Sequence, residues 1–345
     1  MSKQYSIIIP CYNTKDTLEE LLVSIISSSN ADQFEIIVVD DGSTDGTYQA
    51  IKNYPVRVIR SEINKGSAHA RNIGAFYAKT PLLIFFDADI IIQSDTLEKL
   101  IACTGGQPNN HVYMGIYSHD PVHKSFVSMY KAMLDTWHWQ NIKTNAVTSF
   151  EPRCAIMHKS LFEKVGGFDE TFSGADVEDY ELGYRLLALD TILYVNTDIK
   201  VHHHFPMTGK ELLKTMFSRS MSWAQLFVHR KQFDNVASTP EAALSCGIAG
   251  WSILLWPLIF YDCIAFLFFL ALLCLFGYLV SGFFVQVKNY YGFWIGICLL
   301  VFHYMVCGVI FWGGMTGLFG SIIKYGHFSY LLKKRSACLN NNILI

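Results

Sequence analysis

The N-terminal part of the chain alternates between short apolar runs and stretches with helical spacing. Apolar runs predict strands at residues 6–9, 35–39, 56–60 and 82–86, and helical spacing predicts helices at 15–29, 44–53 and 67–78. Strands joined through helices form right-handed βαβ units and a mostly parallel sheet. We therefore expect an α/β fold, with Asn13 or Thr14 capping the first helix and Ser43 or Thr44 capping the second.

The pattern becomes less regular after residue 90. A helix near 123–140 is rich in Met, Trp and Tyr, which either line a binding site or pack against the sheet. A helix near 177–189 and short strands near 192–195 and 199–202 follow. Residues 208–232 form a basic amphipathic pattern, which is typical of a helix on a membrane surface, although an ordinary surface helix has a similar pattern.

The C-terminal tail has the composition of membrane segments. From residue 242 to residue 323, Asp262 and Lys288 are the only charged residues. A single helix over 242–287 would be more than twice as long as a bilayer core of about 30 Å is thick. We therefore predict two segments, broken near Pro257 to Asp262, and a third apolar segment over 293–323.

The charges around this tail bear on its topology. Basic residues after the third segment favour a cytoplasmic C-terminus, and they are Lys324, Lys333, Lys334 and Arg335. The polar N-terminus enters a strand without a signal peptide, so the sheet domain is also expected in the cytoplasm. Two cytoplasmic ends require an even number of crossings, which conflicts with three segments unless one is re-entrant or the third is split. We expect a multi-pass protein of a bacterial inner membrane.

These patterns divide the chain into three parts. They are a sheet domain over residues 1–205, an amphipathic interfacial helix over 206–240 and a transmembrane region of two to three helices with a basic tail over 241–345. The formal net charge of −2 gives no basic footprint for nucleic acid. The nine cysteines include no CxxC pair, so neither a zinc site nor a disulfide framework is expected.

Acidic residues follow two of the predicted strands. Asp40 and Asp41 come after the second strand, and Asp87 and Asp89 follow the fourth. Ligands of open α/β sheets bind beyond the carboxyl ends of the strands, so we expect these acids in one crevice. The i, i+2 spacing places Asp87 and Asp89 on one face, where a hard divalent cation would offset their repulsion. This chemistry suits a metal-bound, phosphate-containing substrate.

Five stretches, taken together in their order and spacing, resemble family-2 glycosyltransferases with the GT-A fold. They are residues 6–13 (SIIIPCYN), 39–47 (VDDGSTDGT), 64–72 (NKGSAHARN), 87–89 (DAD) and 178–179 (ED). The resemblance implies a GT-A nucleotide-sugar-binding domain over the first 200 or so residues. It also implies inverting transfer from a nucleotide-diphosphate sugar, with a UDP-sugar as the first candidate.

The resemblance assigns the first two stretches to the nucleotide. Asp40 and Asp41 would bind the base and ribose, and Pro10, Tyr12 and Asn13 would form the facing wall. This assignment agrees with their chemistry, because a carboxylate can accept hydrogen bonds from a uracil N–H or from ribose hydroxyls. The alternative is a turn, because Asp-Asp-Gly-Ser is favourable turn sequence without any ligand.

The next two stretches are expected near the donor diphosphate. Lys65 and Arg71 are the candidates, and Arg71 suits a bidentate phosphate contact. A solvated helix face is the alternative for Lys65. In the DxD motif, the resemblance places Asp87 at the ribose or donor sugar and Asp89 on a bound Mn²⁺ or Mg²⁺. That metal would offset the charge on the leaving nucleoside diphosphate.

The last stretch carries the expected catalytic base. By the resemblance, Asp179 takes the proton of the acceptor hydroxyl, and Glu178 lies beside the donor. The alternative is a helix whose first-turn acids favour its dipole and whose N-cap is Asp176. His202 or His204, which share a face of a strand, is the candidate further metal ligand, and a polar strand end is the alternative.

Residues Arg219 to Trp223 partly match the Q/RxxRW motif of processive synthases. Ser222 stands where the second arginine is expected, and the tail is short, so we favour transfer of a single sugar to a lipid-linked or membrane-proximal glycan acceptor. Trp223 is expected at the donor and acceptor site or as an interfacial anchor. The rival functions are a polyprenyl-monophosphate sugar synthase, a nucleotidyltransferase and a non-catalytic nucleotide-sugar-binding membrane subunit.

Overall fold

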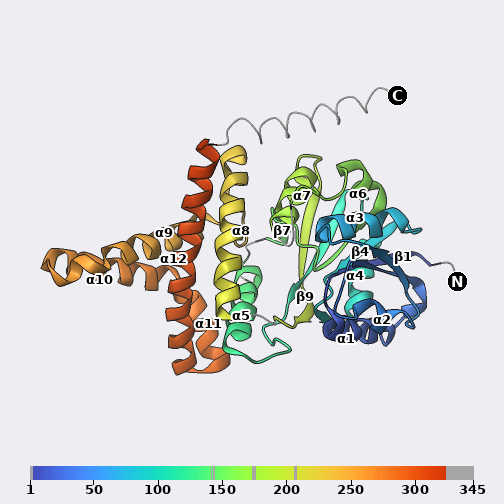
Figure 1. Ribbon diagram of the computed structural model, residues 1–345, viewed down its shortest axis with the longest axis horizontal. Coiled ribbons are helices and arrows are strands. Elements are labelled where there is room, and N and C mark those ends of the chain that lie inside the picture. The colour runs from blue at the N-terminus through green and yellow to red at the C-terminus, as the bar shows by residue number, and fades with distance from the viewer. Residues whose placement is uncertain (1–2, 141, 143, 173–175, 206–207, 324–345) are drawn as a thin grey trace.

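The computed structural model describes residues 3–140, 142, 144–172, 176–205 and 208–323. Figure 1 shows a sheet with helices on both faces, joined along one side to a group of long helices. The sheet and its helices come first in the sequence and the long helices last. Lys324, Lys333, Lys334 and Arg335, on which the expected topology partly depends, lie outside the described residues.

One mixed sheet forms the centre of the first part. Its strand order is β3-β2-β1-β4-β8-β6-β9-β5, and β7 (Ala146–Val147) pairs with β9. The predicted strands are confirmed as a parallel set: β1 (Tyr5–Cys11) lies between β2 (Phe34–Asp41) and β4 (Leu82–Phe86), and β2 pairs with β3 (Arg57–Ser61). The carboxyl ends of these strands therefore meet at one edge of the sheet, where the acids are.

The other half of the sheet differs more from the prediction. β8 (Cys154–His158) runs antiparallel to β4 and β6 (His111–Tyr117), and β5 (Ile90–Ile92) runs antiparallel to β9 (Ile192–His203). The two short strands predicted near 192–202 are one strand, β9, with a register shift opposite Met114 and Ile116. We did not predict β6 and β8, because they are buried on both faces and lack alternation.

The predicted helices of this part are confirmed as α1 (Lys15–Ile26), α2 (Thr47–Ile51) and α3 (Ser67–Tyr77). The predicted N-cap position of α1 is confirmed at Thr14, which makes no capping hydrogen bond. The predicted cap of α2 is wrong, because this helix begins after Gly46 and not at Ser43 or Thr44. Asp45 fixes the start of α2, because its Oδ1 accepts the N–H of Thr47, the first residue of that helix, at 2.9 Å.

The core lies on both faces of the sheet. Alternate residues of each central strand face opposite sides, so Ile7 and Ile9 pack beneath α1, whereas Ile8 packs against α3. The further helices on these faces are α4 (Thr96–Thr104), α6 (Lys159–Val165) and α7 (Glu178–Leu187). This double packing fixes the strand ends that carry the acids.

The helical part begins with α8 (Gly209–Arg230), which starts in a capping box made by Thr208 and Glu211. Its other elements are α9 (Pro240–Leu255), the 3₁₀ helix η2 (Trp256–Phe260), α10 (Cys263–Leu279), α11 (Ser281–Tyr291) and α12 (Phe293–Ile323). Within the described residues, Pro240–Phe260 and Phe293–Ser321 are long and apolar enough to cross a membrane. The helices α10 and α11 together reach that length but are bent by 63°.

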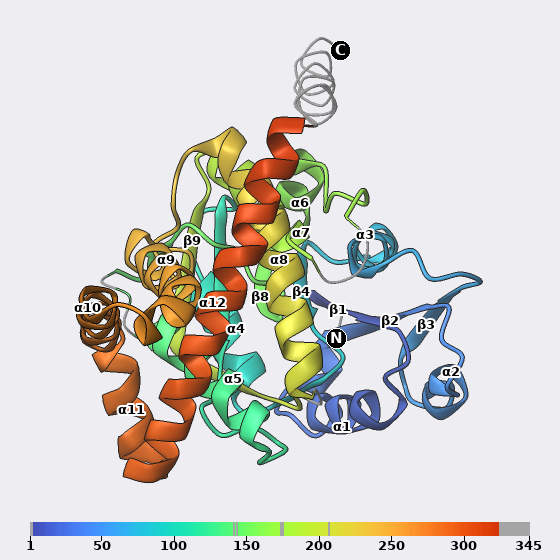
Figure 2. The same cartoon turned by 60° about the vertical axis from the view of Figure 1, so that its left-hand side comes forward.

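Helix α8 lies between the sheet domain and α12 (Figures 1 and 2). Gly313 and Gly317 of α12 allow the close approach, because a Cβ at Gly317 would lie 2.2 Å from the carbonyl oxygen of Met221. Small residues four apart are typical of close helix pairs. The aromatic helix predicted near 123–140 is α5 (Phe126–Gln140), and Tyr130 and Met133 pack against α11 and α12.

Candidate active site

A cavity of about 1360 Å³ lies between the carboxyl edge of the sheet and the long helices. Its volume is larger than that of an ordinary ligand pocket, which is roughly 300–1,000 Å³. The predicted site residues that line it come from six separate parts of the chain and are Pro10, Tyr12, Asp41, Arg71, Asp87, Asp89, Glu178, Asp179 and Trp223. The fold therefore brings Asp41, the DxD acids and the ED motif to one hollow.

The two acids at the end of β2 have different surroundings. Asp40 is fully buried outside the cavity, where it accepts the Ser43 N–H at 2.9 Å and lies 3.3 Å from Arg60 Nε. Asp41 Oδ2 accepts the backbone N–H groups of Lys65 and Gly66 at 2.9 and 2.7 Å. Its Oδ1 is buried without a protein partner and its side chain lines the cavity. The turn alternative thus describes the contacts of Asp40, and Asp41 is the acid available to a ligand.

The facing wall is divided in a similar way. Pro10 and Tyr12 line the cavity, whereas Asn13 does not. Asn13 has φ of 53°, and its Oδ1 accepts the Thr44 N–H at 2.8 Å, so it joins the two loops at the strand ends. Lys65 is exposed and reaches this region through its backbone N–H alone among the contacts described for it.

Arg71 joins three of the motif stretches. It is 6% exposed, and its guanidinium contacts Asp87 Oδ1 at 2.8 Å and Glu178 Oε1 at 3.2 Å. Burial alone would raise the pKa of Glu178, but Arg71 and the Ser67 hydroxyl hold it below its usual value. The Nε of Arg71 has no protein partner. Arg71 therefore positions two acids, a role that its expected phosphate contact did not include.

The histidines after β9 are arranged differently from our expectation. His203 Nε2 lies 3.3 Å from Asp89 Oδ2. Burial alone would raise the pKa of Asp89, but the contact with His203 holds it below its usual value. His202 contacts the Asp120 carbonyl oxygen at 2.8 Å, and His204 lies beside His123 and Glu20. His202 and His204 were the expected ligands, but the residue between them is the one whose side chain meets Asp89.

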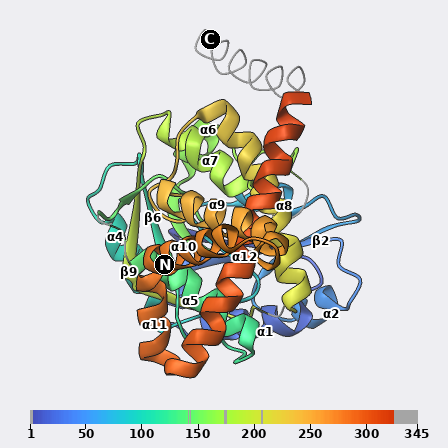
Figure 3. The same cartoon turned by 90° about the vertical axis from the view of Figure 1, so that its left-hand side faces the viewer.

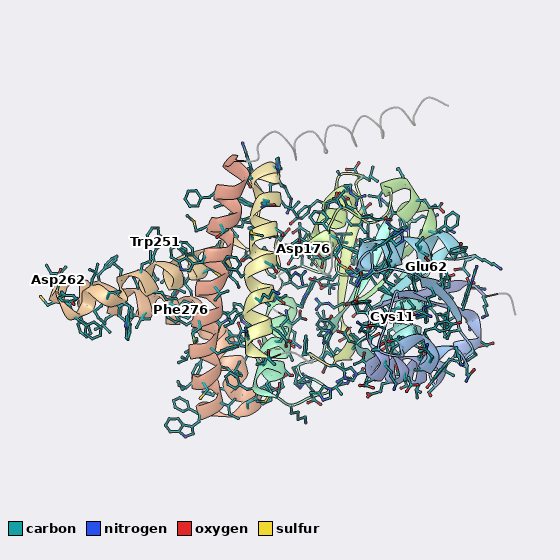
Figure 4. The ribbon with its side chains drawn as sticks, in the orientation of Figure 1. Cys11, Glu62, Asp176, Trp251, Asp262 and Phe276 are labelled. Carbon is teal, nitrogen blue, oxygen red and sulfur yellow. The ribbon has the colours of Figure 1, made fainter. Side chains whose placement is uncertain are left out.

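Asp179 lies at the start of α7 and faces α8. Its Oδ1 accepts the Tyr180 N–H at 2.8 Å, and its Oδ2 lies 3.2 Å from Arg219 Nη2. Burial raises the pKa of Asp179 to about 8, and Arg219 acts in the opposite direction. Asp176 is not the N-cap, which is Val177; instead Asp176 accepts the Ser222 hydroxyl at 2.8 Å (Figure 4).

Ser222 and Trp223 therefore contact residues that hold the loop and the helix around Asp179 in place. The Trp223 indole N–H lies 3.4 Å from Asp234 Oδ2, and Asp234 also accepts from Tyr184 at 3.0 Å and Arg230 at 2.8 Å. These contacts hold the segment after α8 against α7. The serine that departs from the processive motif thus has its own partner in Asp176.

Sequence reasoning missed a buried charged group deeper in the cavity. Arg153 contacts Asp135 at 2.7 Å and Glu151 at 3.6 Å, and its guanidinium lies 4.1 Å from the centre of the Tyr117 ring. Lys131, whose pKa burial lowers, lines the same region. The available signal was the stretch from Pro152 to Met157, because it places an arginine directly before a run of apolar residues.

We predict that Arg71→Met lowers the free energy of unfolding by about 3–5 kcal/mol, because it leaves Asp87 and Glu178 without their shared cation. Arg57→Met is the matched control. Its Nη1 lies 3.9 Å from Glu35 Oε1 and its side chain is 40% exposed, so the loss should be below about 1 kcal/mol. Chemical denaturation of the full chain in detergent measures both. Equal losses would contradict the positioning role of Arg71.

The solved structures include one that is similar over nearly the whole chain. It is the mannosyltransferase PcManGT from Pyrobaculum calidifontis, in complex with GDP-Man and Mn²⁺. The match has a TM-score of 0.57 and 16% sequence identity, and it covers 93% of this chain and 88% of that one. At this identity the likeness shows the fold, which is GT-A.

Curated relatives match the N-terminal part. A validoxylamine A glucosyltransferase of Streptomyces hygroscopicus subsp. jinggangensis is 31% identical over 215 residues, which are 53% of this chain and 51% of the relative. A poly-beta-1,6-N-acetyl-D-glucosamine synthase of Staphylococcus epidermidis is 24% identical over 256 residues, covering 68% of this chain and 61% of the synthase. The chain thus spans about half the length of the first relative.

A further match indicates the family. Residues 6–166 fit the family described as glycosyl transferase family 2. That segment holds the parallel strands, the acid pairs and Arg71, and the ED motif follows it. Residues 6–166 thus match glycosyl transferase family 2, and the sheet domain has the GT-A fold.

Proposed function

We propose that this protein transfers a single sugar from a nucleotide-diphosphate sugar to an acceptor at the membrane surface, with inversion at the sugar. One observation carries the proposal: a single cavity runs from Asp41 and Asp89 past Asp179 to the apolar helices α9 and α12. The family match supports the donor class. The size of the cavity supports two substrates, since it exceeds what one small ligand needs.

The donor end would hold the nucleotide between Asp41 and the wall of Pro10 and Tyr12. The unpaired Oδ1 of Asp41 can accept from a base N–H or a ribose hydroxyl. Arg71 has a free Nε at the cavity, beside Asp87, for the diphosphate or sugar. A UDP-sugar is the donor that we place first, and the similar PcManGT was solved with GDP-Man, so both bases belong in the test.

A divalent cation, Mn²⁺ or Mg²⁺, is the proposed cofactor. Across the described residues no group of three or more His, Cys, Asp or Glu side chains is arranged for a metal. Asp89 and His203 nevertheless supply a carboxylate and an imidazole 3.3 Å apart at the cavity, and a donor diphosphate would supply further oxygens. An imidazole suits Mn²⁺ better than Mg²⁺. The metal supplies charge stabilisation for the leaving diphosphate.

Asp179 is the proposed general base. It lies in the cavity between the donor end and the long helices, so an acceptor hydroxyl beside it would face the donor sugar. Arg219 favours the ionised form that a base requires. Lys131, Arg153 and Arg219 also line this part of the cavity, which favours an acceptor phosphate as the second candidate. The acceptor would then attack through phosphate, as in a polyprenyl-monophosphate sugar synthase.

The acceptor end is apolar. Its walls come from α8, α9 and α12 and include Phe227, Ala243, Cys246, Phe311 and Gly314. Such a surface suits the hydrocarbon part of a lipid-linked acceptor better than a free sugar. The protein would therefore act at a membrane, with its sheet domain in the cytoplasm, where nucleotide sugars are made.

The first experiment offers a panel of UDP- and GDP-sugars to the purified chain, with and without Mn²⁺. We expect Mn²⁺-dependent release of nucleoside diphosphate from one donor, reduced about 100-fold by Asp89→Ala and by His203→Ala. His202→Ala is the matched control and should keep the rate, because its ring contacts the Asp120 carbonyl. Release of pyrophosphate would indicate a nucleotidyltransferase, and no turnover with tight binding would indicate a non-catalytic subunit.

The role of Asp179 predicts a pH dependence. A base must be deprotonated, so transfer should fall about tenfold per pH unit below a pKa near 8. Arg219→Met removes a cation that favours the carboxylate, so it should move the profile to higher pH. Asp179→Asn should lower transfer about 10²–10⁴-fold. Near-normal transfer in that variant would instead favour attack by an acceptor phosphate.

The acceptor end can be blocked by one substitution. Gly314 lines the cavity and has no atom within 4 Å of where a Cβ would lie, so Gly314→Phe should project its ring into the apolar arm. Gly247→Phe, on α9 outside the cavity and equally open, is the matched control. We expect Gly314→Phe to abolish transfer to lipid acceptors from a membrane extract while donor hydrolysis continues. Equal transfer by both variants would exclude this arm as the acceptor site.

A further inference from the structure

The hairpin of α9 and α10 points away from the rest of the protein. Figures 1 and 2 show it projecting from the side of α12 that is opposite the sheet domain. Its outer surface is apolar on both helices, with exposed side chains that include Trp251, Phe260, Ile264 and Leu267. Figure 4 places Asp262 at the far tip, and the other charged residue of the hairpin, Glu241, lies in the first turn of α9 at its base.

Helix α12 is placed differently, because it runs alongside α5 and α8, which lie between it and the sheet. The Tyr291 hydroxyl, just before α12, donates to the His119 carbonyl at 3.1 Å. His303 in the middle contacts the Tyr130 hydroxyl of α5 at 2.9 Å. Gly313 and Gly317 near its end meet the backbone of α8. A helix of 31 residues is about 46 Å long, and these contacts cover most of it.

The contacts of α8 disfavour a crossing by α12. The face of α8 away from α12 holds Arg219 against Asp179 and Ser222 against Asp176. If α12 ran through the bilayer, these charged groups and the sheet domain would lie beside it at hydrocarbon depth. Charged groups at that depth are costly. The sufficient length of α12 for a crossing is therefore outweighed by what it is packed against.

Counted over its full length, including the part of α9 that packs on α12 through Ser252 and Tyr304 at 2.7 Å, the hairpin is about as long as the bilayer core is thick. The 16 residues of α9 with the five of η2 extend about 34 Å, and the 17 of α10 extend about 25 Å. The hydrocarbon core is about 30 Å thick. Tyr261 is 89% exposed beside Asp262, so an aromatic ring and a charge would emerge at the far headgroups. The 63° bend after α10 then turns α11 back along the near surface.

We propose that the α9–α10 hairpin crosses the bilayer twice, and that α8 and α12 lie along the membrane surface on the side of the sheet domain. Figure 3 looks onto the surface that would face the lipid. Two crossings return the chain to its starting side, which removes the conflict between three apolar segments and a basic cytoplasmic tail. The cavity then opens at the membrane surface, because Pro240, Ala243 and Cys246 at the base of the hairpin line it.

The depth of nitroxide labels in lipid vesicles tests this topology. Labels replace exposed residues of α12, namely Trp294, Met305 and Phe319, in the full-length chain. Their depths should agree within about 5 Å for a surface helix. A crossing helix would instead bury its centre about 15 Å deeper than its ends, and that result would overturn the proposal. Phe76 of α3, also exposed, is the reference for a label in water.

The same measurement on α10 should give the opposite profile. Labels at Ile264 and Tyr278 should be shallow and a label at Leu270 about 15 Å deeper, whereas a constant depth would contradict a crossing.

The native Cys263 gives a second test without substitution on the hairpin, because it is exposed beside Asp262. In sealed vesicles, an impermeant maleimide should reach Cys263 from the side opposite Glu62→Cys in the sheet domain. Labelling of both from one side, or no labelling of Cys263, would overturn the proposal. Neither measurement requires sugar transfer.

Discussion

The buried guanidinium of Arg71 is the interaction on which the site depends. Asp87 and Glu178 come from distant parts of the sequence and would repel each other in a shared hollow. Arg71 contacts both carboxylates, so a single cation from α3 holds the end of β4 beside the start of α7. Because Asp89 follows Asp87 and Asp179 follows Glu178, this cation also sets the separation between the proposed metal end and the proposed base.

Helix α8 is the second structural requirement. One face contacts the region of Asp176 and Asp179, and the other receives α12 at Gly313 and Gly317. The helix therefore couples the sheet domain to the apolar helices through direct contacts on both of its faces. A site built in this way has a polar wall from the sheet and an apolar wall from the long helices, which suits two substrates of different chemistry.

The proposed orientation explains why these walls meet. If α8 and α12 lie on the membrane surface, the base of the hairpin and the acceptor end of the cavity are at the same level as the lipid headgroups. A lipid-linked acceptor could then enter from the bilayer while the donor enters from water at the end near Tyr12 and Asp41. The membrane would contribute to catalysis by presenting one substrate at a fixed height.

The sequence by itself determined the parallel strands, the helices between them and the acids at the strand ends, because local hydrophobic periodicity and strand polarity decide these features. It also indicated the family, through five motifs that occur in the order and spacing of family-2 glycosyltransferases. The tertiary structure decided which acids face the cavity: Asp40 turns into its loop, and Asp41 remains available. It placed His203, and not His202 or His204, beside Asp89, and it revealed Arg153, since these depend on strand register and on contacts between distant segments. The relation of α12 to the sheet domain likewise comes from packing, because an apolar sequence is equally suited to crossing a bilayer and to lying against another helix.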